Sequence, residues 1–206
     1  MAVNPAISIA VPRGALVSIA ADGSKTSIPF QYNPDTIRRT LTPNTVGGTQ
    51  GARSGAVRFA GAPAEEITFT CQLTATMATA PPAGTPTPEH GVSASLAALT
   101  LLAYPTTAAV ASAQAMLDAG AIEVLPPLAD RLLLVWGTER VVPARLTGCT
   151  VTEQLYDTNL VPVAATVEVT LRTLTYSDVD PGNHAYHDFV VYQQGLEKQA
   201  TAAERR

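Results

Sequence analysis

Side chains that could do chemistry gather near the carboxyl end of the chain. Five residues of metal-ligand type lie there: Asp178, Asp180, His184, His187 and Asp188. His184 and His187 are three positions apart, whereas the zinc-peptidase helix places its histidines four apart, with a glutamate directly after the first. Pro181-Gly182 interrupts the segment and favours a turn. A metal-dependent hydrolase is one interpretation, but an acidic turn is simpler, and we predict no metal and no cofactor.

Other candidate catalytic groups fail on spacing. Glu65-Glu66 is a carboxylate pair, but neighbouring residues of a strand point to opposite faces and cannot flank one substrate bond. Gly23-Ser24-Lys25-Thr26 lacks the glycine that precedes the lysine of a phosphate-binding loop, so it is a hairpin turn. No serine lies in a nucleophile-elbow sequence. The sequence therefore predicts that the chain is not an enzyme.

The two cysteines, Cys71 and Cys149, lie far apart in the sequence. Cys71 occupies an inward position of an alternating strand, and Cys149 lies in a long extended segment. Two free thiols that pack as small apolar groups are the favoured interpretation, and a disulfide is the alternative.

Composition narrows the class of partner. The chain of 206 residues is 46% hydrophobic and only 15% charged, which indicates a large core or a surface covered by partners. A net charge of -4 argues against nucleic-acid binding. No apolar run approaches the ~20 residues that span a bilayer, so we expect no membrane insertion. The amino terminus has no basic leader before an apolar run, and we expect the chain to remain in the cytoplasm until a larger assembly carries it elsewhere.

The elements that would position these residues are mostly strands. Arg131 to Tyr176 predicts an antiparallel meander of three strands, with Val167 and Val169 on one face of the last and Thr170 on the other. Glu65 to Thr76 alternates in the same way, with inward positions Ile67, Phe69, Cys71 and Leu73. Ala15 to Ile19 and Ser27 to Tyr32 predict a hairpin.

Helices are expected where leucine and alanine recur between proline-rich segments. Val92 to Tyr104 and Ala109 to Ala119 fit short helices. The predicted fold is mainly β with one or two flanking helices. We predict a β domain over residues 1–180 with a helical insertion at about 92–120, and a carboxy-terminal tail or helix over residues 181–206. The helical option would place Tyr186, Phe189, Val190 and Gln193 on one side.

Several motifs, in order and spacing, resemble those of contractile injection system tube proteins. They are Phe30-Gln31-Tyr32-Asn33-Pro34, Arg58-Phe59-Ala60-Gly61-Ala62-Pro63-Ala64-Glu65-Glu66-Ile67, Ser95-Leu96-Ala97-Ala98-Leu99 to Tyr104-Pro105, Leu134-Val135-Trp136-Gly137, Val142-Pro143-Ala144-Arg145-Leu146-Thr147, Thr152-Glu153-Gln154-Leu155-Tyr156-Asp157 and Asn159-Leu160-Val161-Pro162. The resemblance covers most of the chain from Phe30 onward. It is to the family that forms the tube-initiating layer in the baseplate of phage-tail-like particles.

The resemblance implies a tail-tube-like β-barrel or two-sheet sandwich built on antiparallel strands. It also implies a six-fold ring of this chain between the inner tube protein and the spike or hub, assembled in the cytoplasm within a baseplate. Some members carry a carboxy-terminal LysM module, which is not present in these residues, so a role that depends on it is not expected.

The expected assembly interface lies in two segments. Leu41 onward is expected to be a loop, and its glycine-rich part, Gly47 to Gly55, is either a mobile surface loop or a segment that becomes ordered against a neighbouring subunit. The candidate interface residues around this loop and at the turn of the meander are Arg38, Arg39, Arg53, Arg58, Tyr156, Asp157 and Asn159. Two other functions remain open, namely a binding module for cell-wall glycan or a small ligand, and the hydrolase considered above.

Overall fold

The computed structural model describes residues 14–20, 23–30, 33–47, 57–75, 91–120, 129–137 and 140–204. Its strands are β1 (Ala15–Ile19), β2 (Lys25–Pro29), β3 (Ile37–Thr42), β4 (Thr45–Val46), β5 (Arg58–Phe59), β6 (Ala64–Thr74), β7 (Arg131–Trp136), β8 (Arg140–Tyr156) and β9 (Pro162–Thr173). Its helices are α1 (Ser93–Leu101), α2 (Thr107–Asp118) and α3 (His184–Glu204). No helix within these ranges is long and apolar enough to cross a membrane.

Seven strands form one antiparallel sheet in the order β2-β1-β7-β8-β9-β6-β3, and β4 and β5 form a separate two-stranded ribbon. The predicted meander is confirmed as β7, β8 and β9. The predicted alternation is also confirmed, because Val167 and Val169 are fully buried and face Cys71 and Phe69 across the β6–β9 pair. This burial follows from the two-residue repeat of a strand.

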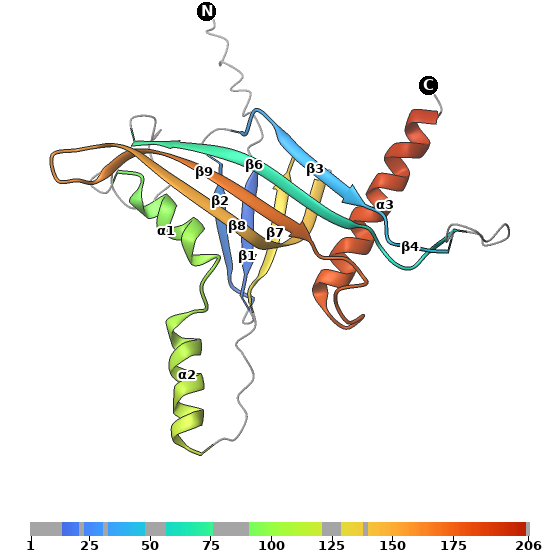
Figure 1. The fold of residues 1–206 in the computed structure, drawn as a ribbon, viewed down its shortest axis with the longest axis horizontal. Coiled ribbons are helices and arrows are strands. Elements are labelled where there is room, and N and C mark those ends of the chain that lie inside the picture. The colour runs from blue at the N-terminus through green and yellow to red at the C-terminus, as the bar shows by residue number, and fades with distance from the viewer. Residues whose placement is uncertain are drawn as a thin grey trace, which may run out of the picture.

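The large sheet folds over on itself, so that its two ends face each other across the core (Figure 1). Phe30 follows the edge strand β2, yet its ring lies 5.2 Å from that of Phe69 in β6, near the other edge of the sheet. A β-bulge at Thr147 shifts the register of β8 against β9. Bulges bend and twist a strand, and β8 pairs with β7 before this point and only with β9 after it. The fold is therefore mainly β and sandwich-like, as predicted, and the described strands do not close into a barrel.

Helices α1 and α3 cover openings of the folded sheet. Leu96 and Leu99 of α1, and Phe189 and Tyr192 of α3, belong to the same hydrophobic core as the strands. The start of α1 is fixed to β9, because the Val92 amide donates to the Pro162 carbonyl at 3.1 Å. At Gly91, φ is +56° and an added Cβ would lie 2.3 Å from the Pro162 carbonyl oxygen, so the approach requires glycine.

Helix α2 is different, because none of its residues is buried. Figure 1 shows it standing away from the sheet below α1. The Thr106 hydroxyl caps it by accepting from the Ala109 amide at 3.2 Å.

Two expectations from the sequence need correction. The segment from Leu41 onward is not all loop, since β3 continues to Thr42 and β4 and β5 follow it. The segment over residues 181–206, for which a tail or a helix was expected, contains α3, and this helix buries an apolar stripe against the sheet. That stripe is Ala185, Phe189 and Tyr192, whereas Gln193, expected on it, is exposed. The glycine-rich loop beyond Gly47, with Arg53, lies outside the described residues up to Ala56.

Candidate assembly interface

The predicted interface residues fall at two ends of the molecule. Arg38 lies exposed on β3, and Arg58 lies exposed on β5. Tyr156, Asp157 and Asn159 lie exposed at the turn between β8 and β9. Figure 1 places this turn and the β4 ribbon at opposite ends of the long axis, so the structure does not bring the two predicted groups together within one chain.

Arg39, the remaining described member, is engaged within its own chain. Its Nε lies 2.5 Å from Oε1 of Glu65, and its Nη2 donates to the Tyr192 hydroxyl at 2.6 Å. Burial lowers the pKa of Arg39, but the hydrogen bond and charge of Glu65 outweigh it, so the pKa is raised overall. Glu65 is only 4% exposed, and this pairing satisfies a carboxylate that faces the core. The cluster ties α3 to the β3–β6 side of the sheet.

The turn between β8 and β9 is rigidly built. One oxygen of the Asp157 carboxylate accepts from the backbone amides of Asn159 and Val161, both at 2.8 Å. The Leu160 amide donates to the Asp157 carbonyl at 3.1 Å. Asp157 therefore organises the turn itself, as the sequence pattern of a turn at Asp157 and Asn159 suggested.

Two leucines at this turn have a conformation that leucine rarely adopts. Leu155 has φ of 54° and Leu160 has φ of 62°, in the left-handed region. Their side chains are 73% and 80% exposed. Strained backbone that presents large apolar groups to solvent is typical of functional surfaces rather than of a stability-optimised turn.

The opposite end carries a second exposed apolar group on the ribbon of β4 and β5. Phe59 is 84% exposed and Val46 is 55% exposed, and Val57 beside them is 66% exposed. The ribbon is held at its base, since the Ala60 amide donates to the Asn44 carbonyl at 2.9 Å and the Ala62 amide to the Ser177 hydroxyl at 3.1 Å. Apolar side chains this exposed on an ordered ribbon indicate a contact surface.

Strands β3 and β8 have open edges, a feature that the sequence did not predict. Strand β3 pairs with β6 on one side, and among the described residues no strand pairs with its other side. Strand β8 pairs with β7 only as far as Ala144, so its stretch Arg145–Tyr156 has one edge to which no described strand is paired. Open edges present free backbone donors and acceptors and template further pairing. Only the topology reveals them, because they depend on which strands are neighbours.

Two of the acidic residues considered as metal ligands have structural partners. The Asp178 carboxylate accepts from the amide and hydroxyl of Thr175, at 3.0 and 2.7 Å, and so organises a turn. Oδ2 of Asp188 lies 3.4 Å from Nε of Arg131, and the two side chains form an ion pair. In the described part of the chain, no three His, Cys, Asp or Glu side chains are grouped closely enough to hold a metal ion. Cys71 and Cys149 are free thiols, as the favoured interpretation of the sequence had it.

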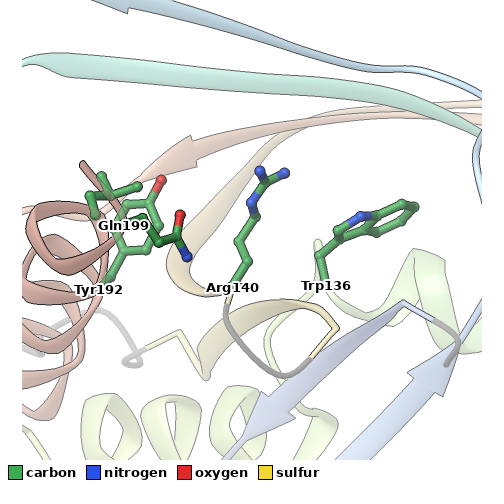
Figure 2. Close-up of a pocket in the computed structure, with 5 residues that line it drawn as sticks. Trp136, Arg140, Tyr192 and Gln199 are labelled. Atoms are coloured by element: carbon green, nitrogen blue, oxygen red, sulfur yellow. The ribbon is translucent and has the colours of Figure 1, made fainter. Parts of the chain in front are cut away.

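One hollow lies between the β7–β8 turn and α3. Figure 2 shows Trp136, Arg140, Tyr192 and Gln199 around it, and its volume is about 140 Å³. Pockets for small organic ligands usually measure roughly 300–1,000 Å³. This hollow is too small for such a ligand. A second hollow measures about 520 Å³, but its lining residues all belong to α3, namely Gln194, Glu197, Lys198, Thr201 and Ala202.

The comparisons with known proteins do not identify a family for this chain. No protein-family model and no curated protein matches the chain. Among solved structures, a chain in the tail of an empty gene transfer agent particle, determined with helical refinement and C6 symmetry, has 11% identity and a TM-score of 0.32. A chain in the virion of a native gene transfer agent particle has 9% identity and a TM-score of 0.31. Each alignment covers 78% of this chain and 90% of the other. Similarity this weak does not establish a common fold.

Proposed function

We propose that the chain is a structural subunit of a phage-tail-like particle, in which copies of it form a ring by joining their sheets edge to edge. The observation that carries the proposal is the pair of open edges, on β3 and on the Arg145–Tyr156 stretch of β8. They lie on opposite sides of the four-strand unit β8-β9-β6-β3. An interface between two different edges is heterologous, and repeated rotation can close it into a ring.

Strand direction supports this joining. Every pair in the unit is antiparallel, so β3 runs opposite to β8. When a second copy is rotated until its β8 lies beside β3 of the first, the alternation of directions continues without a break. The new ladder is antiparallel like the others, and backbone hydrogen bonds satisfy both edges.

Composition and sequence motifs support the same function. Only 15% of the residues are charged, which suits a chain whose surface is largely covered in an assembly. The motifs from Phe30 onward resemble tube proteins of contractile injection systems. On that basis the finer proposal is a six-fold baseplate ring, assembled in the cytoplasm, that joins the inner tube protein to the spike or hub.

Proline at the β3 edge tests the ring. The backbone amides of an edge strand point alternately toward the neighbouring strand and toward the open side. One of the two variants Thr40→Pro and Leu41→Pro therefore removes an amide that is directed at the open side. That variant should keep its thermal unfolding transition. We expect it to stay monomeric in sedimentation and electron microscopy under conditions in which the wild-type chain forms rings.

Two results would count against the proposal. A wild-type chain that remains monomeric across a wide concentration series would contradict the ring itself. Rings that form equally well with the folded proline variant would exclude β3 as the joining edge. Thr201→Pro, at an exposed position near the end of α3, is the matched control and should leave rings unchanged.

A further inference from the structure

The small hollow between the β7–β8 turn and α3 is lined by side chains from two elements. Trp136 and Arg140 are direct partners across the β7–β8 pair, so their side chains lie on the same face of the sheet. Tyr192, Leu196 and Gln199 follow at intervals of four and three residues along α3, which places them on one face of the helix. The docking of α3 on the sheet brings these two sets together around the hollow.

Four of the lining side chains carry hydrogen-bond donors. The guanidinium of Arg140 and the indole of Trp136 only donate, and the Gln199 amide has two N–H groups. The Tyr192 hydroxyl accepts from Nη2 of Arg39 at 2.6 Å, which leaves its own proton available to an acceptor in the hollow. In Figure 2 the Arg140 guanidinium stands between the Trp136 indole and the Tyr192 ring. None of the lining residues that the structure describes is Asp or Glu.

The charge of Arg140 is not balanced within the described part of the chain. The ion pairs found there involve three other arginines, and Arg140 is in none of them although it is half-buried. Burial and the charge of Glu65 raise the pKa of Tyr192, and two positive charges, one of them that of Arg140, oppose the rise. The other is that of Arg39, which Glu65 neutralises. One guanidinium close to the Tyr192 hydroxyl is therefore left without a carboxylate partner.

We propose that this hollow is a binding site for a carboxylate group. A carboxylate is planar, carries one negative charge and accepts two parallel hydrogen bonds from a guanidinium. It matches the single unbalanced charge of Arg140, and the flat rings of Trp136 and Tyr192 on either side suit a planar group. The Tyr192 hydroxyl and the Gln199 amide supply donors for the remaining lone pairs of the carboxylate. A phosphate is tetrahedral and carries more charge than one arginine balances.

The size and rigidity of the hollow fit a small group. Its volume of about 140 Å³ is below that of pockets for whole organic ligands but is ample for a few heavy atoms. Gln199 is exposed and Leu196 is 40% exposed, so the α3 side of the hollow is open to solvent. The Trp136 wall is fixed, because a Cβ added at Gly14 would lie 2.6 Å from Cε3 of the indole. The site is therefore preformed and accessible.

The carboxylate can belong to a free acid or to an acidic side chain of another protein. The site does not depend on the proposed ring, because no lining residue lies on the open edge of β3 or in Arg145–Tyr156. Failure of the ring would leave the carboxylate site untouched, and the reverse also holds.

Trp136 is the only tryptophan of the chain and reports on the hollow directly. The full chain is titrated with sodium acetate in place of sodium chloride at constant ionic strength, while indole fluorescence and the indole N–H resonance are followed. We expect saturable changes in both, with a dissociation constant roughly in the millimolar range. Inorganic phosphate should bind more weakly than acetate.

A second titration identifies the source of the carboxylate. It uses glutamate blocked at its amino and carboxyl ends, with blocked glutamine as the uncharged control, which should not bind. Tighter binding of blocked glutamate than of acetate would indicate an acidic side chain of a protein. Binding of acetate without binding of blocked glutamate would indicate a free acid.

Substitutions assign the binding to the hollow. Arg140→Gln should weaken acetate binding by about tenfold or more, because charge-assisted hydrogen bonds are lost. Gln199→Ala, at an exposed position of α3 where the fold is not at risk, should weaken it by about threefold. Arg145→Gln, at an exposed position of β8, removes the same charge elsewhere and is the matched control with unchanged affinity. Thermal unfolding checks that each variant is folded.

Three results would overturn the carboxylate site. The first is a wild-type chain whose indole signals do not respond to acetate in a saturable way. The second is an equal loss in Arg140→Gln and Arg145→Gln, which would reduce the effect to nonspecific attraction between charges, or an unchanged affinity in both Arg140→Gln and Gln199→Ala. The third is tighter binding of phosphate than of acetate.

Discussion

At the scale of residues, the cluster of Arg39, Glu65 and Tyr192 joins two parts of the chain that are 153 positions apart. Glu65 faces the core, where an unpaired carboxylate is costly, and Arg39 both neutralises it and donates a second hydrogen bond to α3. Burial and the negative charge of Glu65 raise the pKa of Tyr192, so its hydroxyl stays protonated. The cluster therefore stabilises the docking of α3.

Removing Arg39 should destabilise the fold more than removing the tyrosine hydroxyl. Arg39→Ala leaves the Glu65 carboxylate buried without its partner, at a cost of about 3 kcal/mol in the free energy of unfolding. Tyr192→Phe loses one hydrogen bond and should cost about 1 kcal/mol. Urea unfolding followed by circular dichroism measures both. Arg38→Ala, on the exposed face of the same strand, should change stability by less than about 0.5 kcal/mol, and equal losses for Arg38→Ala and Arg39→Ala would contradict this account.

This cluster shows what a sequence can and cannot predict about single residues. The two-residue repeat correctly separated Glu65 from Glu66, since Glu65 is buried and Glu66 exposed. The partners of Glu65 were beyond prediction, because Tyr192 approaches only after the sheet has folded over and α3 has docked. Arg39 was selected as an interface residue from its neighbours in the sequence, and the structure engages it within the chain.

At the scale of elements, the two short helices have opposite relations to the core. Helix α1 buries Leu96 and Leu99, whereas α2 buries nothing. A helix of 12 residues that buries no side chain in the core is marginal in water. Only one residue of α2, Asp118, is charged, so its surface is poorly suited to solvent in an isolated subunit.

We expect α2 to melt independently of the rest of the fold. Ala111→Pro should abolish its helix but change the free energy of global unfolding by less than about 0.5 kcal/mol, since no core contact is lost. Leu99→Ala in α1 should cost about 2–5 kcal/mol because it leaves a cavity in the core. Urea unfolding measures the first quantity, and hydrogen exchange of residues 107–118 reports the helix. A large loss of global stability in Ala111→Pro would show that α2 packs on the domain.

The sequence pattern predicted the faces of some strands and not of others, because the strands differ in how many of their side chains are buried. Strands β6 and β9 each bury one face, so their apolar residues alternate and their faces could be predicted. Strand β3 reads Ile-Arg-Arg-Thr-Leu-Thr and has no such alternation, because most of its side chains are exposed. Its strand conformation comes from pairing with β6, which is a tertiary effect.

At the scale of the whole molecule, the sequence predicted the mainly β class and the meander but not how the sheet closes over its core. A bulge at Thr147 bends β8 three residues beyond Ala144, where its pairing with β7 ends. Nothing in the local pattern of Val and Thr marks one residue as the extra one. The open edges of β3 and β8 depend on which strands become neighbours in the sheet, and so they were likewise beyond prediction.

The folded sheet also determines how its stability responds to alkaline pH, through a thiol in the core. Cys71 is 2% exposed on β6, facing Val167 of β9. Burial, with a smaller contribution from the charge of Cys149, raises the pKa of Cys71 from 9.0 to about 12. The thiol cannot ionise readily while the core is intact, so its titration is linked to global unfolding.

The free energy of unfolding should therefore fall as pH rises above 9. Below the ordinary thiol pKa both states hold the proton and the stability is fully present, whereas between pH 9 and about 12 only the unfolded chain releases it. One such proton contributes a slope of at most about 1.4 kcal/mol per pH unit. Cys71→Ala should lower stability at pH 8 but flatten this slope in urea unfolding between pH 8 and 11. Tyr192 and Cys149 also have raised pKa values and are present in both proteins, so the slope difference isolates Cys71. Parallel curves for the two proteins would mean that the Cys71 thiol ionises as easily in the folded chain as in the unfolded one.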